Sequence, residues 1–151
     1  VKLLLLGMED KVNPVKPENL KWAKSTANVL MPGPVHKDLV CRYIAASDML
    51  VHPTYREGFG KIIQEAMSMQ LPVITTDVPG PSEVVEENIS GILVPKADAK
   101  ALADAMCKLY EDKELADRIA EAGYKRFLEN FTMEKMVKNI YDEYSKITGL
   151  C

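Results

Sequence analysis

Two acidic residues and two glycines fall close together in the middle of this sequence. Glu57 opens the run Glu-Gly-Phe-Gly, in which Gly58 and Gly60 flank Phe59, and Glu65 follows in the next stretch. Glycine lets a backbone approach a ligand closely and adopt dihedral angles that other residues avoid. The free N–H groups and the dipole at the start of a helix favour a phosphate. With a helix after this loop, the stretch predicts a site for a phosphate-containing ligand.

Glu65 is expected on the packed side of that helix. The apolar residues Ile62, Ala66 and Met69 form one stripe, and Glu65 lies in or beside it. A carboxylate there is costly unless it finds donors. A ribose diol offers two hydroxyl donors, and each charge-assisted hydrogen bond is worth roughly 1.5–3 kcal/mol. Seven residues separate Glu57 from Glu65, so the loop acid and the helix acid can contact two parts of one elongated ligand.

Simpler explanations of these residues stay open at this point. Glu65 is equally explained as an acid in the first half of a helix, stabilised by the dipole. Glu57 is explained as a solvated loop acid, and Gly58 and Gly60 as ordinary turn residues. A lone Gly-x-Gly is a weak signal, and a Walker loop and a dinucleotide-binding fingerprint both fail because glycines that they require are absent.

Short apolar runs alternate with amphipathic stretches along the chain. The runs predict strands at residues 2–6, 28–31, 49–52, 72–75 and 91–94, and the stretches predict helices over 18–27, 37–47, 60–69 and 81–87. Asp98 can cap a further helix, and two more follow, the last of them starting at Thr132. The pattern predicts an α/β fold: a Rossmann-like parallel sheet of about five strands, flanked by helices, with a helical C-terminal tail. Ligands then bind beyond the carboxyl ends of the strands.

The composition narrows the class of protein. The chain has 151 residues, which fits one domain, and 47% of them are hydrophobic, which excludes a disordered chain. Its net charge of −3 disfavours nucleic-acid binding. No apolar run approaches the roughly 20 residues of a transmembrane helix. Cys41, Cys107 and Cys151 are too scattered for a disulfide framework or a zinc site, which favours a reducing compartment.

Four segments, in this order, resemble motifs of the family 4 retaining glycosyltransferases, which use the GT-B fold and belong to the group 1 type. The run ASDMLVHP at residues 46–53 resembles the family's Ala-Ala-Asp-Val-x-Val-x-Pro segment. The Glu-x7-Glu motif is matched by EGFGKIIQEAM at residues 57–67. A Gly-Gly-x-x-Glu loop is matched by GPSEVVE at residues 80–86, and a Gly-Leu-Leu-Val-Pro strand by GILVP at residues 91–95.

The resemblance implies one half of a GT-B fold, in which two Rossmann-like domains face each other across a cleft. Residues 1–151 would form the C-terminal nucleotide-sugar-binding domain, truncated at its N-terminal side and lacking the N-terminal domain. The implied enzyme is a hexosyltransferase-type glycosyltransferase that takes a nucleoside diphosphate sugar, with a UDP-sugar favoured, and transfers the sugar with retention. The implied acceptor is a glycan, polysaccharide or lipid-linked molecule. No cofactor and no bound metal are implied, because the helix dipole and basic residues neutralise the diphosphate.

The resemblance also assigns roles to single residues. Glu57 is the implied catalytic residue. The transferred sugar would contact Glu57, Gly58, Phe59 and Gly60. The ribose hydroxyls would be held by Glu65, and the diphosphate would lie near Lys61 and Ile62. The base would be bordered by the turn around Pro34, Val35 and Lys37. The implied location is cytoplasmic, with the full-length protein peripheral at the inner membrane face.

The sequence departs from the family pattern at two positions and in its extent. Gln70 replaces a glycine that would cap the motif helix, and Pro79 replaces the first glycine of the second loop and stiffens it. The family's basic diphosphate clamp belongs to a strand and helix expected before Val1, and the acceptor site belongs to the N-terminal domain. We therefore expect this chain alone to bind donor weakly without turnover.

Two other functions remain to be separated from the leading one: a nucleotide-sugar epimerase of the same fold, which would lack the Glu-x7-Glu spacing, and a non-catalytic nucleotide-binding module. His52, at a strand end beside the loop, is either a hydrogen-bonded structural histidine or a contact to the donor sugar. The apolar stripe of the last helix, over residues 132–147, is expected to be partly exposed when this chain is isolated.

Overall fold

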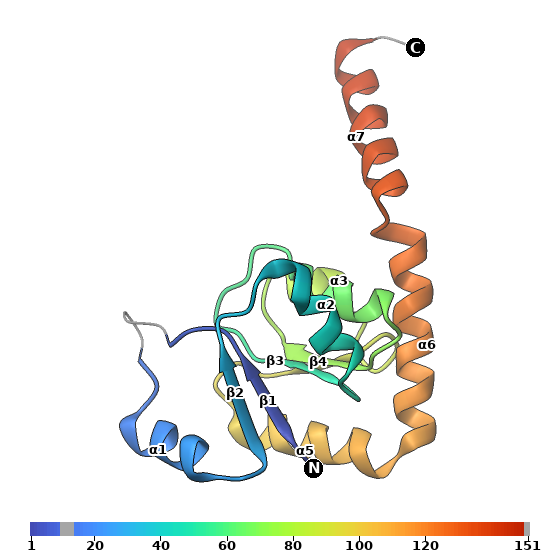
Figure 1. The fold of residues 1–151 in the computed structure, drawn as a ribbon. Coiled ribbons are helices and arrows are strands. Elements are labelled where there is room, and N and C mark those ends of the chain that lie inside the picture. The colour runs from blue at the N-terminus through green and yellow to red at the C-terminus, as the bar shows by residue number, and fades with distance from the viewer. Residues whose placement is uncertain (10–13, 150–151) are drawn as a thin grey trace. The chain divides into compact units, whose positions relative to one another are not determined.

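The computed structural model describes residues 1–9 and 14–149, in which helices and strands alternate as the sequence predicts (Figure 1). The strands are β1 (Leu3–Leu6), β2 (Val29–Gly33), β3 (Leu50–His52), β4 (Val73–Thr76) and β5 (Ile92–Val94). The helices are α1 (Pro17–Ser25), α2 (Lys37–Ala45), α3 (Lys61–Ser68), α4 (Pro81–Val84), α5 (Ala99–Glu111), α6 (Lys113–Asn130) and α7 (Met133–Thr148). The predicted α/β class with flanking helices and a helical tail is confirmed.

The strands pair in two parallel sheets instead of one continuous sheet. β1 pairs with β2, and β4 pairs with β3 on one side and with β5 on the other. The chain correspondingly divides into two compact units between Arg42 and Tyr43. Among the described strands, only β4 is therefore paired on both edges. Hydropathy patterns predict strands one at a time and do not specify which strands pair, so the sequence did not show this division.

The second unit is built around β4, whose four residues are all buried. Ile74 of β4 packs in an apolar cluster with the neighbouring strand and two helices. The buried members of this cluster are Ile74, Ile92, Val94, Ala105, Leu109, Leu115 and Ile119. The side chain of Asp98 accepts a hydrogen bond from Ala101 N at 2.9 Å and caps α5 as predicted.

Helix α6 packs closely on α3. A Cβ built on Gly123 of α6 would lie 3.1 Å from the carbonyl oxygen of Ser90 and 3.4 Å from Cγ of Met67 in α3. The absence of a side chain at Gly123 therefore allows the helix to approach. Figure 1 shows α6, in orange, next to α3 and crossing its direction.

The buried stripe of α3 shares only Ala66 with the predicted one. The buried residues are Ile63, Ala66 and Met67, whereas Ile62 and Met69 are only half-buried. Gly60 ends the preceding loop with φ of +69°, and a Cβ built there would lie 2.8 Å from Cδ1 of Ile63. The Ile63 side chain thus folds back over Gly60, and this contact sets the rotation of the helix.

Helix α4 is shorter than the predicted helix over residues 81–87. It ends at Val84 because Val85 already has extended dihedral angles, with φ of −99° and ψ of 128°. The N–H of Glu86 donates to Oγ of Ser90 at 2.9 Å and so leaves the helical pattern. The end of the helix thus involves a side-chain hydrogen bond, which the spacing of apolar residues does not predict.

The C-terminal helix α7 exposes its apolar stripe, as expected. Its stripe residues are between 48% and 80% exposed: Met133, Met136, Val137, Ile140, Tyr144 and Ile147. Oγ1 of Thr132 accepts a hydrogen bond from Lys135 N at 3.3 Å and caps the helix. None of the helices in the described residues is long and apolar enough to cross a membrane. Cys41 and Cys107 are free thiols, and Cys151 lies outside the described residues.

Candidate functional site

The loop that carries Glu57 leaves β3 and is fixed at its start by two threonines of β4. Oγ1 of Thr75 donates to the carbonyl of His52 at 2.9 Å. Oγ1 of Thr76 donates to the carbonyl of Thr54 at 2.6 Å and accepts from the N–H of Thr54 at 2.9 Å. Thr75 and Thr76 are 0% and 3% exposed. Neither threonine is among the predicted site residues, although two hydroxyls at the end of a buried apolar strand are a signal visible in the sequence.

Both oxygens of the Glu57 carboxylate have partners within the protein. Oε1 accepts from the N–H of Gly58 at 2.9 Å, and Oε2 lies 3.2 Å from Nε2 of His52. The hydrogen bond from His52 lowers the pKa of Glu57, with smaller contributions from the backbone N–H groups of Gly60 and Gly58, while burial opposes the shift. The Glu57 side chain is 30% exposed. Its carboxylate is therefore ionised and fixed by hydrogen bonds, and it is not freely solvated.

His52 is therefore placed against the Glu57 side chain. This pairing agrees with the expectation of a hydrogen-bonded structural histidine. It also locates that histidine beside the residue to which the resemblance gives a catalytic role. Because His52 ends β3 and Glu57 lies five residues later, the pair closes a short loop at the carboxyl edge of the sheet.

Gly60 connects this loop to the start of α3. Its left-handed backbone directs its carbonyl to accept from the N–H groups of Ile63 at 2.9 Å and Gln64 at 3.3 Å. Lys61 and Ile62 occupy the first turn, where N–H groups have no acceptor within the helix. The dipole of α3 adds positive potential at the same end. The structure therefore places an N-terminal helix end directly after Glu57 in the chain, as the sequence predicts.

The second predicted loop lies directly against the first. Gly80 has φ of +92°, and a Cβ built on it would lie 2.8 Å from the carbonyl oxygens of both Glu57 and Gly58. Pro81 follows as the first residue of α4. The two motifs, more than twenty residues apart in sequence, are thus in contact through their backbones.

Phe131, which is not among the predicted site residues, contacts this loop, and Arg126 in turn contacts Phe131. The ring of Phe59, which is 52% exposed, meets the ring of Phe131 edge to face, with centroids 6.0 Å apart. The guanidinium carbon of Arg126 lies 5.9 Å from the Phe131 centroid. Neither residue lies in a motif, and each is far from the loop in sequence.

The remaining predicted residues are only partly brought together. Glu65 lies half-buried on α3 beside Ala66, and its carboxylate forms no hydrogen bond with any residue that the structure describes. Pro34, Val35 and Lys37 belong to the first compact unit. The base-binding role assigned to these three residues stays a prediction.

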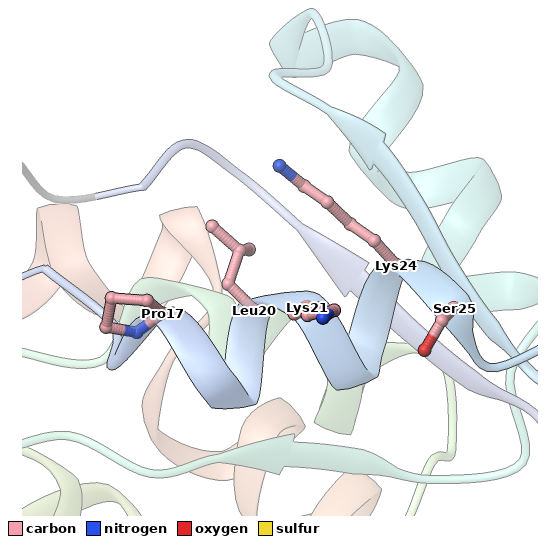
Figure 2. Close-up of a pocket in the computed structure, with 5 residues that line it drawn as sticks. All are labelled: Pro17, Leu20, Lys21, Lys24 and Ser25. Atoms are coloured by element: carbon pink, nitrogen blue, oxygen red, sulfur yellow. The ribbon is translucent and has the colours of Figure 1, made fainter.

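Two cavities lie on the described part of the chain. One of about 450 Å³ is lined by one helix, through Pro17, Leu20, Lys21, Lys24 and Ser25. Figure 2 shows these side chains along α1, and none of them is a predicted site residue. A second cavity, of about 320 Å³, lies at the carboxyl ends of β3, β4 and β5, where Thr54, Thr76 and Pro95 line it. The described residues contain no group of three or more His, Cys, Asp or Glu side chains that could hold a metal ion.

Comparison with known proteins identifies the family. The family model described as "Glycosyl transferases group 1" matches residues 1–126. The chain belongs to the group 1 glycosyltransferases. This group 1 chain is 30% identical over 145 residues to the capsular polysaccharide biosynthesis glycosyltransferase CapM of Staphylococcus aureus, covering 96% of this chain and 38% of CapM. The putative teichuronic acid biosynthesis glycosyltransferase TuaC of Bacillus subtilis is 30% identical over 129 residues, covering 83% of this chain and 33% of TuaC.

Solved structures agree with the fold of this group 1 chain. Sucrose-phosphate synthase from Thermosynechococcus elongatus aligns with a TM-score of 0.82 and 27% identity, covering 99% of this chain and 39% of that one. HepE of Anabaena, solved in complex with UDP-glucose, aligns with a TM-score of 0.82 and 23% identity, covering 96% of this chain and 41% of HepE. The chain thus spans about two fifths of the length of these relatives.

Proposed function

We propose that this chain is the donor-binding domain of a glycosyltransferase that uses a nucleoside diphosphate sugar, with a UDP-sugar favoured. The observation that carries this proposal is the carboxylate of Glu57, which is held between His52 and the N–H of Gly58 in the loop that leads into α3. Membership of the group 1 family supports it. The solved complex of HepE with UDP-glucose also supports it, because HepE has the same fold.

The parts of the donor are distributed along the loop and helix. Glu57 is the proposed catalytic residue and, with residues 58–60, contacts the transferred sugar. The first turn of α3, at Lys61 and Ile62, receives the diphosphate because its N–H groups lack helical acceptors. Glu65, half-buried and without a described partner, accepts hydrogen bonds from both ribose hydroxyls. The helix dipole offsets diphosphate charge in this scheme, which involves neither a cofactor nor a metal.

The transfer itself is proposed to retain the configuration of the sugar and to use a glycan, polysaccharide or lipid-linked acceptor. The names of CapM and TuaC, which refer to capsular polysaccharide and teichuronic acid, support such an acceptor. Residues 1–151 then act as a C-terminal domain, with the acceptor site on an N-terminal domain, in the cytoplasm.

A calorimetric titration with UDP, GDP and ADP tests the donor site. We expect weak binding of one nucleotide, UDP first, and its loss in Glu65→Gln, which keeps the shape of the side chain but removes its charge. Glu121→Gln is the matched control, because Glu121 is exposed on α6, and it should bind as the unsubstituted chain does. A folded chain that binds none of the three nucleotides, or equal binding by Glu65→Gln, contradicts the proposal.

A further inference from the structure

Arg126 of α6 is bonded to the end of α4, more than forty residues away in sequence. Its Nε donates to the carbonyl of Val84 at 2.7 Å, and its Nη2 donates to the carbonyl of Glu83 at 3.0 Å. These carbonyls lie in the last turn of a helix, where no helical donors remain. Nη1 also lies 3.3 Å from Oε1 of Glu86. The guanidinium thus satisfies and fixes the C-terminal end of α4.

The other end of α4 touches the loop that carries Glu57. Its N-cap residue, Gly80, leaves no room for a Cβ against the carbonyl oxygens of Glu57 and Gly58. Because α4 is a single turn of four residues, a displacement of its C-terminal end has little length over which to be absorbed. A change in the position of Arg126 is therefore transmitted to the Glu57 backbone through one short helix.

A second contact joins the same end of α6 to the same loop. Phe131, the C-cap residue of α6, packs edge to face against Phe59, and Arg126 stacks over Phe131. Such aromatic pairs contribute beyond the area that they bury, and the guanidinium adds a cation–π attraction. The loop is therefore supported at Glu57–Gly58 through α4 and at Phe59 through Phe131. Phe131 also lies beyond residues 1–126, which the family model matches.

We propose that Arg126 and Phe131, at the C-terminal end of α6, are positioning residues that hold the 57–60 loop in the geometry that binds the sugar of the donor. The ligand named in this proposal rests on the proposed function, whereas the effect of the two residues on the loop does not. Neither residue contacts the donor in this scheme. They act on the loop by restricting its backbone.

The first test measures amide hydrogen exchange in the ligand-free chain. Arg126→Ala and Phe131→Leu should speed exchange of the Gly58 and Gly60 amides by about tenfold, the effect expected from losing one hydrogen bond to a charged group or one aromatic contact. Arg126→Lys should have a smaller effect, because lysine keeps the charge but not the planar pair of donors. The amides of β4 should be unchanged. Arg118→Ala, an exposed arginine on α6, should leave both regions unchanged.

The second test compares UDP with UDP-glucose by calorimetry. Only UDP-glucose carries the sugar, so Arg126→Ala should weaken its binding about tenfold more than that of UDP. An equal loss for both ligands, or exchange that rises equally in β4 and in the loop, would show a general loss of stability and overturn the proposal. Unchanged loop exchange overturns it as well. If the unsubstituted chain binds neither ligand, the proposed function fails, while the exchange experiment still decides the positioning role.

Discussion

Nε2 of His52 lies 3.2 Å from Oε2 of Glu57, so the last residue of β3 holds the acid to which the proposed function gives a catalytic role. This contact is the largest cause of the lowered pKa of Glu57. A carboxyl whose folded-state pKa lies below its unfolded value stabilises the fold above the unfolded pKa. That contribution is lost as the pH falls through the folded-state pKa.

Replacing His52 should therefore change the acid dependence of stability. In His52→Ala the pKa of Glu57 rises toward its ordinary value of 4.5, and the stabilising contribution of its ionisation shrinks. Urea unfolding near neutral pH and at about pH 3 measures this, because the two chains should differ more at neutral pH than in acid. His36→Ala is the control, since His36 pairs with Asp38 on an exposed surface. An equal difference at both pH values would contradict the prediction.

Gly80 and Gly58 should respond differently to the addition of a methyl group. Gly80→Ala should lower the free energy of unfolding by roughly 1–3 kcal/mol or more, because its φ is positive and its Cβ would clash with two carbonyl oxygens. Gly58→Ala meets nothing within 4 Å and should change stability by less than about 0.5 kcal/mol. Urea unfolding of the two variants checks the contrast, and equal losses would rule out the close approach at Gly80.

The neighbouring isoleucines of α3 provide a matched pair for the packing of the helix. Ile63 is 0% exposed, so Ile63→Ala should cost roughly 2–5 kcal/mol of unfolding free energy. Ile62 is half-buried, and Ile62→Ala should cost clearly less. Thermal or urea unfolding distinguishes them. A larger loss of stability in Ile62→Ala than in Ile63→Ala would instead support the buried stripe that the sequence pattern predicts.

The hydroxyl of Thr76 should be more important for stability than that of Thr54. Thr76→Val removes a buried donor and acceptor and leaves the Thr54 backbone without its partners, a loss of roughly 1–3 kcal/mol. Oγ1 of Thr54 bonds to the backbone of Arg56 at an exposed position, so Thr54→Val should cost less than about 1 kcal/mol. Unfolding measurements on both variants decide this, and comparable losses would argue against anchoring by Thr76.

Much of the fold was predictable because its signals are local. Asp98 caps a helix as predicted, and the last helix begins at Thr132 as predicted, since both signals depend on residues a few positions apart. The error at α3 came from a decision between adjacent apolar residues, Ile62 and Ile63, which both fit a helical period. The contact of Ile63 with Gly60 decides between them, and periodicity does not include it.

The candidate site was predictable only in its sequence-local part. The order of Glu57, Gly60 and α3 follows from the motif. The bond from Arg126 to Val84 and the contact of Phe131 with Phe59 join residues that are 42 and 72 positions apart. No pattern of spacing specifies such pairs, because they form only when α6 is placed against the sheet. The grouping of the strands into two sheets has the same origin.

The two threonines at the end of β4 also determine where the 53–60 loop can move. Neighbouring side chains of a strand point to opposite faces. Thr75 and Thr76 therefore hydrogen-bond to the backbone at His52 and Thr54 from two directions. A hinge needs a few backbone dihedral angles that turn freely, and these bonds remove that freedom at the start of the loop. The backbone freedom of this loop therefore lies after Thr54, in a stretch that includes the exposed side chain of Tyr55.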